Sequence, residues 1–131
     1  MSDLNTEQQA RWEEEHRSPT ALLPMDKESP SRGVTAFADW LTAMGKNLSE
    51  IQIVEMGCGK GRNAIWLAEQ GAKISAFDFS EAAIAEAMRR AHARSLDPQN
   101  PQFMQQDATE RWPWEDNSVD CVVDCFASSD I

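Results

Sequence analysis

A glycine-rich turn between an apolar run and a helical pattern constrains the fold of this chain more than any other feature. The stretch Ile51–Gly71 reads IQIVEMGCGKGRNAIWLAEQG. Its β-branched start is typical of a strand buried on both faces of a parallel sheet, and Glu55 is expected to end that strand. The three glycines of the turn are Gly57, Gly59 and Gly61. Glycine allows positive φ and close approach of a ligand to the main chain, and the apolar residues that follow recur at helical spacing. The stretch therefore predicts strand, glycine turn and helix.

Composition limits the class of protein. The 131 residues suffice for one hydrophobic core, and 22 acidic against 12 basic side chains give a net charge of −10. Such a charge repels phosphate backbones and argues against a nucleic-acid partner. The N-terminus lacks an apolar leader and no run approaches about 18 apolar residues, so we expect a soluble cytoplasmic protein without a membrane partner. The cysteines are odd in number, at Cys58, Cys121 and Cys125. They lie in apolar or glycine-rich segments, which favours reduced thiols over disulfides.

The chain divides into a polar arm and one domain. Residues 1–33 form the expected N-terminal arm, with a possible helix over Thr6–His16 before a segment that is broken by prolines. Trp12 either docks this arm on the domain or belongs to a lid over a pocket, and both interpretations stay open. The domain spans residues 34–131 and opens with a predicted amphipathic helix over Val34–Met44.

Further strands are predicted to alternate with helices. Lys73–Phe77 is expected to be a strand that ends at Asp78, and a helix from Glu81 to about Ser95 follows. The expected inner side of this helix consists of Ala82, Ile84, Ala85, Met88 and Ala91. Gln102–Gln106 and Val119–Phe126 are the third and fourth expected strands. This alternation implies right-handed βαβ units, hence an α/β fold with a Rossmann-like parallel sheet and flanking helices.

Three of the expected strands end in an acid. These residues are Glu55, Asp78 and Asp107. Ligands of open parallel sheets bind outside the carboxyl ends of the strands, so the three side chains should converge on one crevice. There Asp78 could accept hydrogen bonds from a ribose diol, and Asp107 could accept from an exocyclic amine. The simpler alternative for any one of them is a solvated loop acid.

The spacing of the turn favours a cationic ligand over a pyrophosphate. A dinucleotide-binding turn reads G-x-G-x-x-G, whereas here the third glycine comes one residue early, at Gly61, and Arg62 follows it. The acid before the turn would repel a pyrophosphate and attract an ammonium or sulfonium group. No P-loop is present. Cys125 lacks an evident histidine partner for nucleophilic chemistry, and the two histidines and three scattered cysteines offer no metal-ligand spacing, so no metal is expected.

At these motifs the chain resembles a known family. The segment EMGCGKG, Asp78, the pair Asp107-Ala108 and the segment WPWEDNSVDCVV resemble the successive motifs of class I S-adenosylmethionine-dependent methyltransferases. The resemblance covers residues from Val34 to about Ser129. It implies that the three glycines contact the methionine moiety and that Glu55 holds its amine, directly or through water. The nucleoside and methyl ends would be contacted by Asp78 at the ribose, Phe79, Asp107 and Ala108 at the adenine, and Cys125 and Phe126 at the sulfonium.

The resemblance implies in-line methyl transfer from S-adenosylmethionine, with no catalytic residue and no acceptor named. Family members have seven strands in the order 3-2-1-4-5-7-6, whereas this chain is expected to stop after the fourth. Two functions therefore stay open: a methyltransferase, or a truncated module that binds S-adenosylmethionine or S-adenosylhomocysteine without turnover. A NAD-binding domain is a third, disfavoured by the turn. Val119–Phe126 would be an exposed apolar edge through which the chain associates with itself or a partner.

Overall fold

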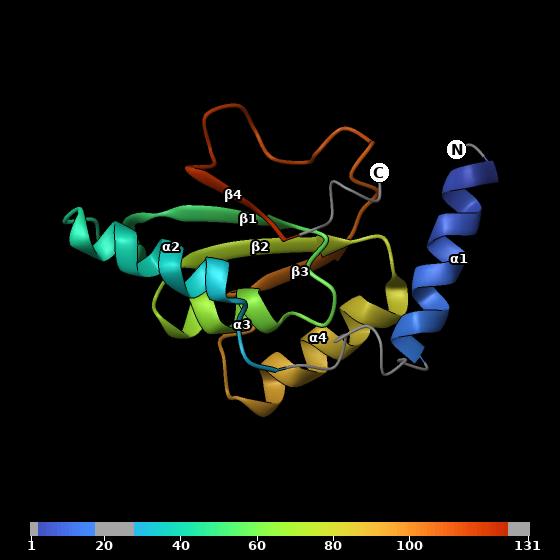
Figure 1. Ribbon diagram of the computed structural model, residues 1–131, viewed down its shortest axis with the longest axis horizontal. Helices are drawn as coiled ribbons and strands as arrows, with labels where there is room; N and C mark the ends of the chain where they lie inside the picture. The colour runs from blue at the N-terminus through green and yellow to red at the C-terminus, as the bar shows by residue number, and fades with distance from the viewer. Residues whose placement is uncertain (1–2, 18–27, 126–131) are drawn as a thin grey trace.

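A four-stranded parallel sheet organises the molecule. The computed structural model describes residues 3–17 and 28–125. Its strands, all parallel in the order β3-β2-β1-β4, are β1 (Gln52–Met56), β2 (Lys73–Asp78), β3 (Gln102–Gln105) and β4 (Cys121–Asp124) (Figure 1). This confirms the α/β sheet and matches the first four strands of the expected order.

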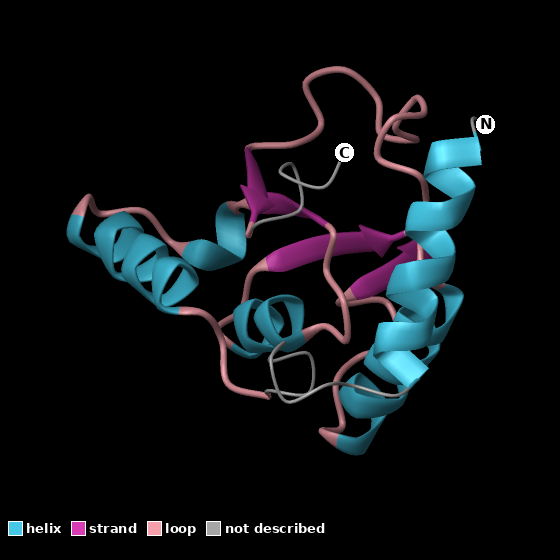
Figure 2. Ribbon diagram, turned by 45° about the vertical axis from the view of Figure 1, so that its right-hand side comes forward, coloured by secondary structure: helices cyan, strands magenta, loops and turns pink. Residues whose placement is uncertain are grey.

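Helices α2 (Arg32–Ala43), α3 (Arg62–Glu69) and α4 (Glu81–Ala93) cover one face of the sheet, whereas α1 (Asp3–Arg17) stands beside the strand ends (Figures 1 and 2). A 3-10 turn, η1 (Leu48–Glu50), leads into β1. The hydroxyls of Ser31 and Ser80 cap α2 and α4 by accepting a backbone N–H three residues on. Serine supplies both caps because its short side chain reaches back to these otherwise unpaired amides.

Small side chains let these helices approach the sheet closely. Ala64 on α3 and Ala76 on β2 are fully buried, and so is the larger Leu67 on α3. The helix pattern after the glycine turn is confirmed, with positive φ at Gly71 as expected for a residue that ends a helix.

Two predictions about this layer were wrong, the second only in part. Glu55 does not end its strand: β1 continues through Met56, and the carboxyl is buried within it. The inner side of α4 was predicted only in part: Ile84 and Ala91 are buried as expected, but Met88 is 56% exposed, and Ala83 and Ala87 are buried instead. Alanines lie on several sides of this helix, so its sequence pattern does not identify one buried face. Packing against the sheet decides which side is buried.

The other face of the sheet is covered by the loop that joins β3 to β4 (Figure 1). Phe77, on β2, lies 5.0 Å from the Trp112 ring and 5.6 Å from the Trp114 ring, measured between centroids. The two indoles are themselves 6.0 Å apart. These three rings, which we call the aromatic cluster, bury Phe77 to 1% exposure without a helix.

Strand β4 is shorter than expected and lies at the edge of the sheet. It begins at Cys121. At the preceding residue, Asp120, the side-chain carboxylate accepts the Gln52 N–H of β1 at 2.8 Å, where a strand would use its backbone carbonyl. Phe126 lies outside the described residues. Within residues 3–17 and 28–125 there is no helix with the length and apolar character of a membrane span.

Candidate functional site

The glycine turn connects β1 to α3 at the carboxyl edge of the sheet. Its φ angles are +67° at Gly57, +57° at Gly59 and +88° at Gly61, which L side chains adopt at a cost. The Cys58 N–H donates to the Phe77 carbonyl at 2.9 Å, so the turn is fastened to the end of β2. The sequence-predicted glycines thus form one rigid loop.

Gly61 has a packing role that sequence reasoning did not identify. A Cβ on this residue would lie 2.9 Å from the Phe103 ring and 3.0 Å from the Ala87 Cβ. The third glycine therefore faces β3 and α4, whereas Gly57 and Gly59 are half-buried. Its signal was in the sequence all the same, because a glycine that opens a helix after a strand often permits close packing.

Glu55 lies on the helix-covered side of β1, at 2% exposure. Its Oε2 accepts a hydrogen bond from Asn63 Nδ2 at 3.0 Å, whereas Oε1 has no hydrogen-bond partner among the described residues. Burial raises the pKa of this carboxyl from 4.5 to about 7; the Asn63 bond, the Arg62 charge and a weaker interaction with the Ala64 backbone oppose that rise, and Asp78 adds to it. An acid in this state is poised to receive a cation, because a positive partner stabilises its ionised form.

Asp78 joins the glycine turn to the start of α4. The carboxylate is 8% exposed; its Oδ2 accepts the Gly59 N–H at 3.0 Å and its Oδ1 accepts the Ser80 N–H at 2.9 Å. These two backbone amides orient the carboxylate. The second strand-end acid therefore holds two turns together at the centre of the site.

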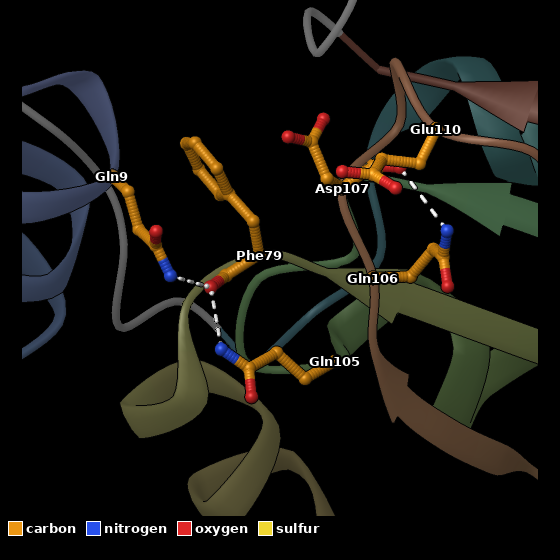
Figure 3. Close-up of a pocket in the computed structure, with 6 residues that line it drawn as sticks. All are labelled: Gln9, Phe79, Gln105, Gln106, Asp107 and Glu110. Carbon is orange, nitrogen blue, oxygen red and sulfur yellow. Dashed lines mark hydrogen bonds between the residues drawn. The ribbon is translucent and has the colours of Figure 1, made fainter. Parts of the chain in front are cut away.

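Asp107 and Phe79 meet at a cavity of about 220 Å³ beside the ends of β2 and β3 (Figure 3). The cavity is lined by Gln9, Phe79, Gln105, Gln106, Asp107 and Glu110. Asp107 accepts hydrogen bonds from the N–H and hydroxyl of Thr109, at 2.8 and 2.6 Å. The Ala108 carbonyl accepts the Trp112 indole N–H at 3.0 Å. The predicted adenine residues are thus adjacent, and the aromatic cluster is tied to them.

One wall of the cavity comes from α1, a contribution that the sequence did not reveal. Gln9 donates to the Phe79 carbonyl at 3.0 Å, and so does Gln105 at 3.1 Å (Figure 3). Glu13 accepts the Ala82 N–H at 3.3 Å, at the start of α4. Helix α1 therefore lies at the strand ends (Figure 2). The Trp12 side chain lies outside the described residues.

The cysteines show buried or half-buried thiols. Burial, together with the nearby Glu55 and Asp78 charges, raises the pKa of Cys58 well above its ordinary value, which keeps this thiol protonated. Cys125 follows the last residue of β4, and its Sγ lies 3.6 Å from the Ser31 hydroxyl. Among the described residues, no group of His, Cys, Asp and Glu side chains could hold a metal ion.

Of the three acids, Asp78 lies close enough to Glu55 to raise its pKa, and the Asp78 carbonyl accepts the Gln106 N–H, next to Asp107, at 2.9 Å. A parallel sheet with a glycine turn and acids near the carboxyl edge is typical of α/β domains that bind nucleosides. Residues 53–130 match the profile of the methyltransferase domain family. The chain belongs to this family, the class I S-adenosylmethionine-dependent methyltransferases.

Relatives in sequence extend well beyond the matched part. An uncharacterized protein of Haemophilus influenzae is 34% identical over 103 residues, which are 78% of this chain and 40% of that protein. Magnesium-protoporphyrin O-methyltransferase of Synechocystis is 35% identical over 77 residues, 59% of this chain and 33% of the enzyme. The chain thus spans less than half the length of these relatives.

Solved structures agree with the fold. Magnesium protoporphyrin IX methyltransferase from Synechocystis with bound SAH is 36% identical, with a TM-score of 0.51 over 58% of this chain and 34% of that one. A structure concerned with conversion of a disulfide bond into a thioacetal group during echinomycin biosynthesis has a TM-score of 0.72 at 27% identity. That match covers 89% of this chain and 46% of the other.

Proposed function

We propose that this chain binds S-adenosylmethionine at the glycine turn and takes part in transfer of its methyl group to an acceptor. The observation that supports this best is Glu55, a buried carboxyl with an unpaired oxygen behind the turn. A cation is the partner that such a group lacks, and the ammonium group of the cofactor supplies one. Family membership supports the same ligand, since relatives are described with SAM or SAH bound.

Most of the predicted residues have a place in this proposal; Gly61 packs against β3 and α4, and Phe126 lies outside the described residues. Gly57 and Gly59 would lie along the methionine moiety, with Glu55 toward the amine, directly or through water. Asp78 would accept from the ribose hydroxyls, and its two backbone amides would hold it in position. Phe79 would pack on the adenine in the cavity that it shares with Asp107, whose carboxylate or the neighbouring Ala108 backbone would receive the adenine edge. Cys125 would lie near the sulfonium.

The cofactor supplies an activated methyl group: the acceptor's lone pair forms the new bond while the S–CH₃ bond breaks and its electron pair stays on sulfur. The protein's contribution is therefore positional, because holding the reacting atoms in line removes much of the entropic barrier. No base or acceptor-side residue is assigned to this chain.

Calorimetric titration with S-adenosylmethionine tests the binding. We expect Asp78→Asn to weaken binding by about tenfold or more, since a lost charge-assisted hydrogen bond contributes about 1.5–3 kcal/mol. Asp39→Asn, on the exposed side of α2, serves as the matched control and should bind like the parent. Absence of heat with the parent protein, or equal affinity in the Asp78 variant with an unchanged melting temperature, would contradict the site.

A binding module without turnover is the second candidate. Transfer of a labelled methyl group from S-adenosylmethionine to a metabolite mixture would support the enzyme, whereas binding without transfer would support the module. If the chain were instead a NAD-binding domain, NAD would raise its melting temperature. We expect no such rise, because Gly61 comes one residue early for a pyrophosphate turn.

We also propose that two copies associate along the outer edge of β4. Among the described strands, β4 pairs only with β1, and Val122 is 52% exposed. An open apolar strand edge tends to pair with another chain. Sedimentation should show a dimer that Val122→Lys weakens. A monodisperse monomer at micromolar concentration, with β4 protected from hydrogen exchange, would refute this association.

A further inference from the structure

A short segment ahead of α2, residues 29–31, is fastened to the start of α3. The Ser29 carbonyl accepts from Arg62 Nη1 at 3.5 Å, and the Ser31 N–H donates to Asn63 Oδ1 at 2.8 Å. The Ser31 hydroxyl also lies 3.6 Å from Cys125 Sγ, just beyond β4. We call residues 29–31 the docking segment. It brings together the glycine-turn helix and the end of β4, although it precedes Asn63 by 32 positions.

The docking segment determines which way the Asn63 amide faces. Asn63 is 3% exposed and lies between the Ser31 N–H and the Glu55 carboxyl. A backbone N–H can only donate, so the amide oxygen must face Ser31 and the amide nitrogen must face Glu55. The donor at 3.0 Å from Glu55 Oε2 is therefore fixed by a hydrogen bond on the opposite side of the same side chain.

A fixed donor favours the ionised form of Glu55 over the neutral one. If the docking segment left, the amide would be free to turn its oxygen to the carboxyl. With the Asn63 amide oxygen facing the Glu55 carboxyl oxygen, a hydrogen bond between them requires a proton on Glu55, and this favours the neutral acid. An ammonium ion attracts the charged form far more strongly than the neutral one.

We propose that Asn63 is a positioning residue that couples the docking segment to the charge of Glu55 and thereby sets the affinity of the site for the cofactor's ammonium group. This inference rests on the proposed function, since it assumes that Glu55 is the group that receives the amine. It adds that affinity depends on whether residues 29–31 are seated on α3.

The electrostatic surroundings of Glu55 make this coupling effective near neutral pH. Burial raises its pKa to about 7, while the Asn63 bond and the Arg62 charge lower it and Asp78 raises it. The Cys58 thiol, also next to Glu55, stays protonated and uncharged. A carboxyl with a pKa in this region changes its mean charge substantially when one hydrogen bond is lost.

A pair of substitutions at Ser31 separates the backbone N–H from the side chain. Ser31 has φ −68° and ψ 152°, so proline fits its backbone while removing the N–H. Ser31→Pro therefore deletes the donor to Asn63, together with the hydroxyl. Ser31→Ala deletes only the hydroxyl and is the matched control. Asn63→Leu is a third variant, which removes the amide at nearly the same volume.

Binding of S-adenosylmethionine is measured by calorimetry from about pH 5.5 to about pH 8.5, a range in which a carboxyl of raised pKa titrates. We expect parent and Ser31→Ala affinities to fall together below about pH 7. For a rise of one unit in the pKa of Glu55, Ser31→Pro and Asn63→Leu should bind about fivefold more weakly at pH 7 and about tenfold more weakly at the acidic end, and should approach the parent at the alkaline end. A purely structural defect would instead lower affinity by the same factor at every pH. Parallel profiles, or identical profiles for the two Ser31 variants, would overturn the proposal.

Titration of the Glu55 carboxyl by carbon-13 NMR in the ligand-free protein gives a second readout, with Glu55→Gln to assign the signal. The pKa should be higher in Ser31→Pro than in Ser31→Ala, and equal values would refute the coupling. This measurement does not depend on the cofactor. If the parent does not bind S-adenosylmethionine at any pH while the two pKa values differ, the proposed function fails but the coupling stands.

Discussion

The two faces of the sheet are closed in different ways. On one face, three helices bury a continuous layer of small and aliphatic side chains, with Leu67 and Ala76 at 0% exposure. On the other, a loop covers β2 by means of the aromatic cluster, in which Trp112 and Trp114 remain half-exposed. Regular helices approach a sheet closely through alanines, whereas an irregular loop needs large rings to cover the same area.

The two faces of the sheet also differ in how many residues of the candidate site they contain. The helix-covered face contains Glu55 and Asn63, so the charge of the candidate site is set inside the better-packed layer. The loop-covered face is joined to the candidate site at Trp112, whose indole N–H donates a hydrogen bond to the Ala108 carbonyl. Substitutions should therefore have larger effects on the helix side, and the following predictions test that difference.

The largest effect is expected from Leu67→Ala in α3. Leu67 is fully buried, and deleting such a side chain leaves a cavity, so the free energy of unfolding should fall by about 4 kcal/mol. Urea denaturation measures this change. Met88→Ala, at an exposed position of α4, is the control and should change stability by less than about 0.5 kcal/mol. A loss at Leu67 below about 1 kcal/mol would mean that the helix layer is loosely packed.

Glu55→Gln should alter the dependence of stability on pH. The folded-state pKa of about 7 lies above the ordinary 4.5, so the folded protein binds the proton more tightly. The stability from this group is present below about pH 4.5 and is lost as pH rises to about 7, an amount of about 3 kcal/mol for this shift. Unfolding free energies of the parent should therefore fall relative to the variant across that window. Curves that stay parallel would show that Glu55 is not perturbed.

Gly61→Ala should destabilise the protein by about 2 kcal/mol. The residue has φ +88°, and the new methyl would meet Phe103 at 2.9 Å and Ala87 at 3.0 Å. Gly33→Ala is the matched control, since Gly33 lies in α2 with no atom within 4 Å of the added Cβ. That control should be neutral or stabilise α2 slightly, because alanine favours helix. Equal thermal melting of the two variants would contradict the close packing at Gly61.

The smallest effect is expected on the loop-covered face. Trp112→Leu keeps an apolar side chain but loses the ring pair with Phe77 and the hydrogen bond to Ala108. We expect a loss of about 1 kcal/mol in the free energy of unfolding, since each of these interactions contributes on that scale. Thermal denaturation followed by circular dichroism measures it. A loss that exceeds that of Leu67→Ala would reverse the comparison between the two faces.

Local features of this protein were predictable from the sequence. Strand, glycine turn and α3 follow within about 20 residues, and each depends on its own residue types and near neighbours. The order of the strands followed from the family resemblance. The positions of Asp78 and Asp107 at or just after the ends of β2 and β3 were predictable, because a strand and its end can be recognised together.

Long-range contacts were not predictable in this way. Gln9 joins Phe79 across 70 positions, and Ser31 joins Asn63 across 32. A single glutamine or serine in a polar segment carries no signal of its partner. The inner side of α4 was wrong in part for a related reason, since its alanines allow several faces and only the neighbouring strands select one.

The sequence by itself determined the class of fold and the succession of strand, glycine turn and helix, because backbone freedom, strand pattern and helix pattern are local properties. Tertiary structure alone decided that Glu55 is buried with one oxygen unpaired, that Gly61 packs against β3 and α4, and that residues 29–31 orient Asn63. Burial and hydrogen-bond partners depend on which distant segments meet, and burial within β1 is what raises the pKa of Glu55.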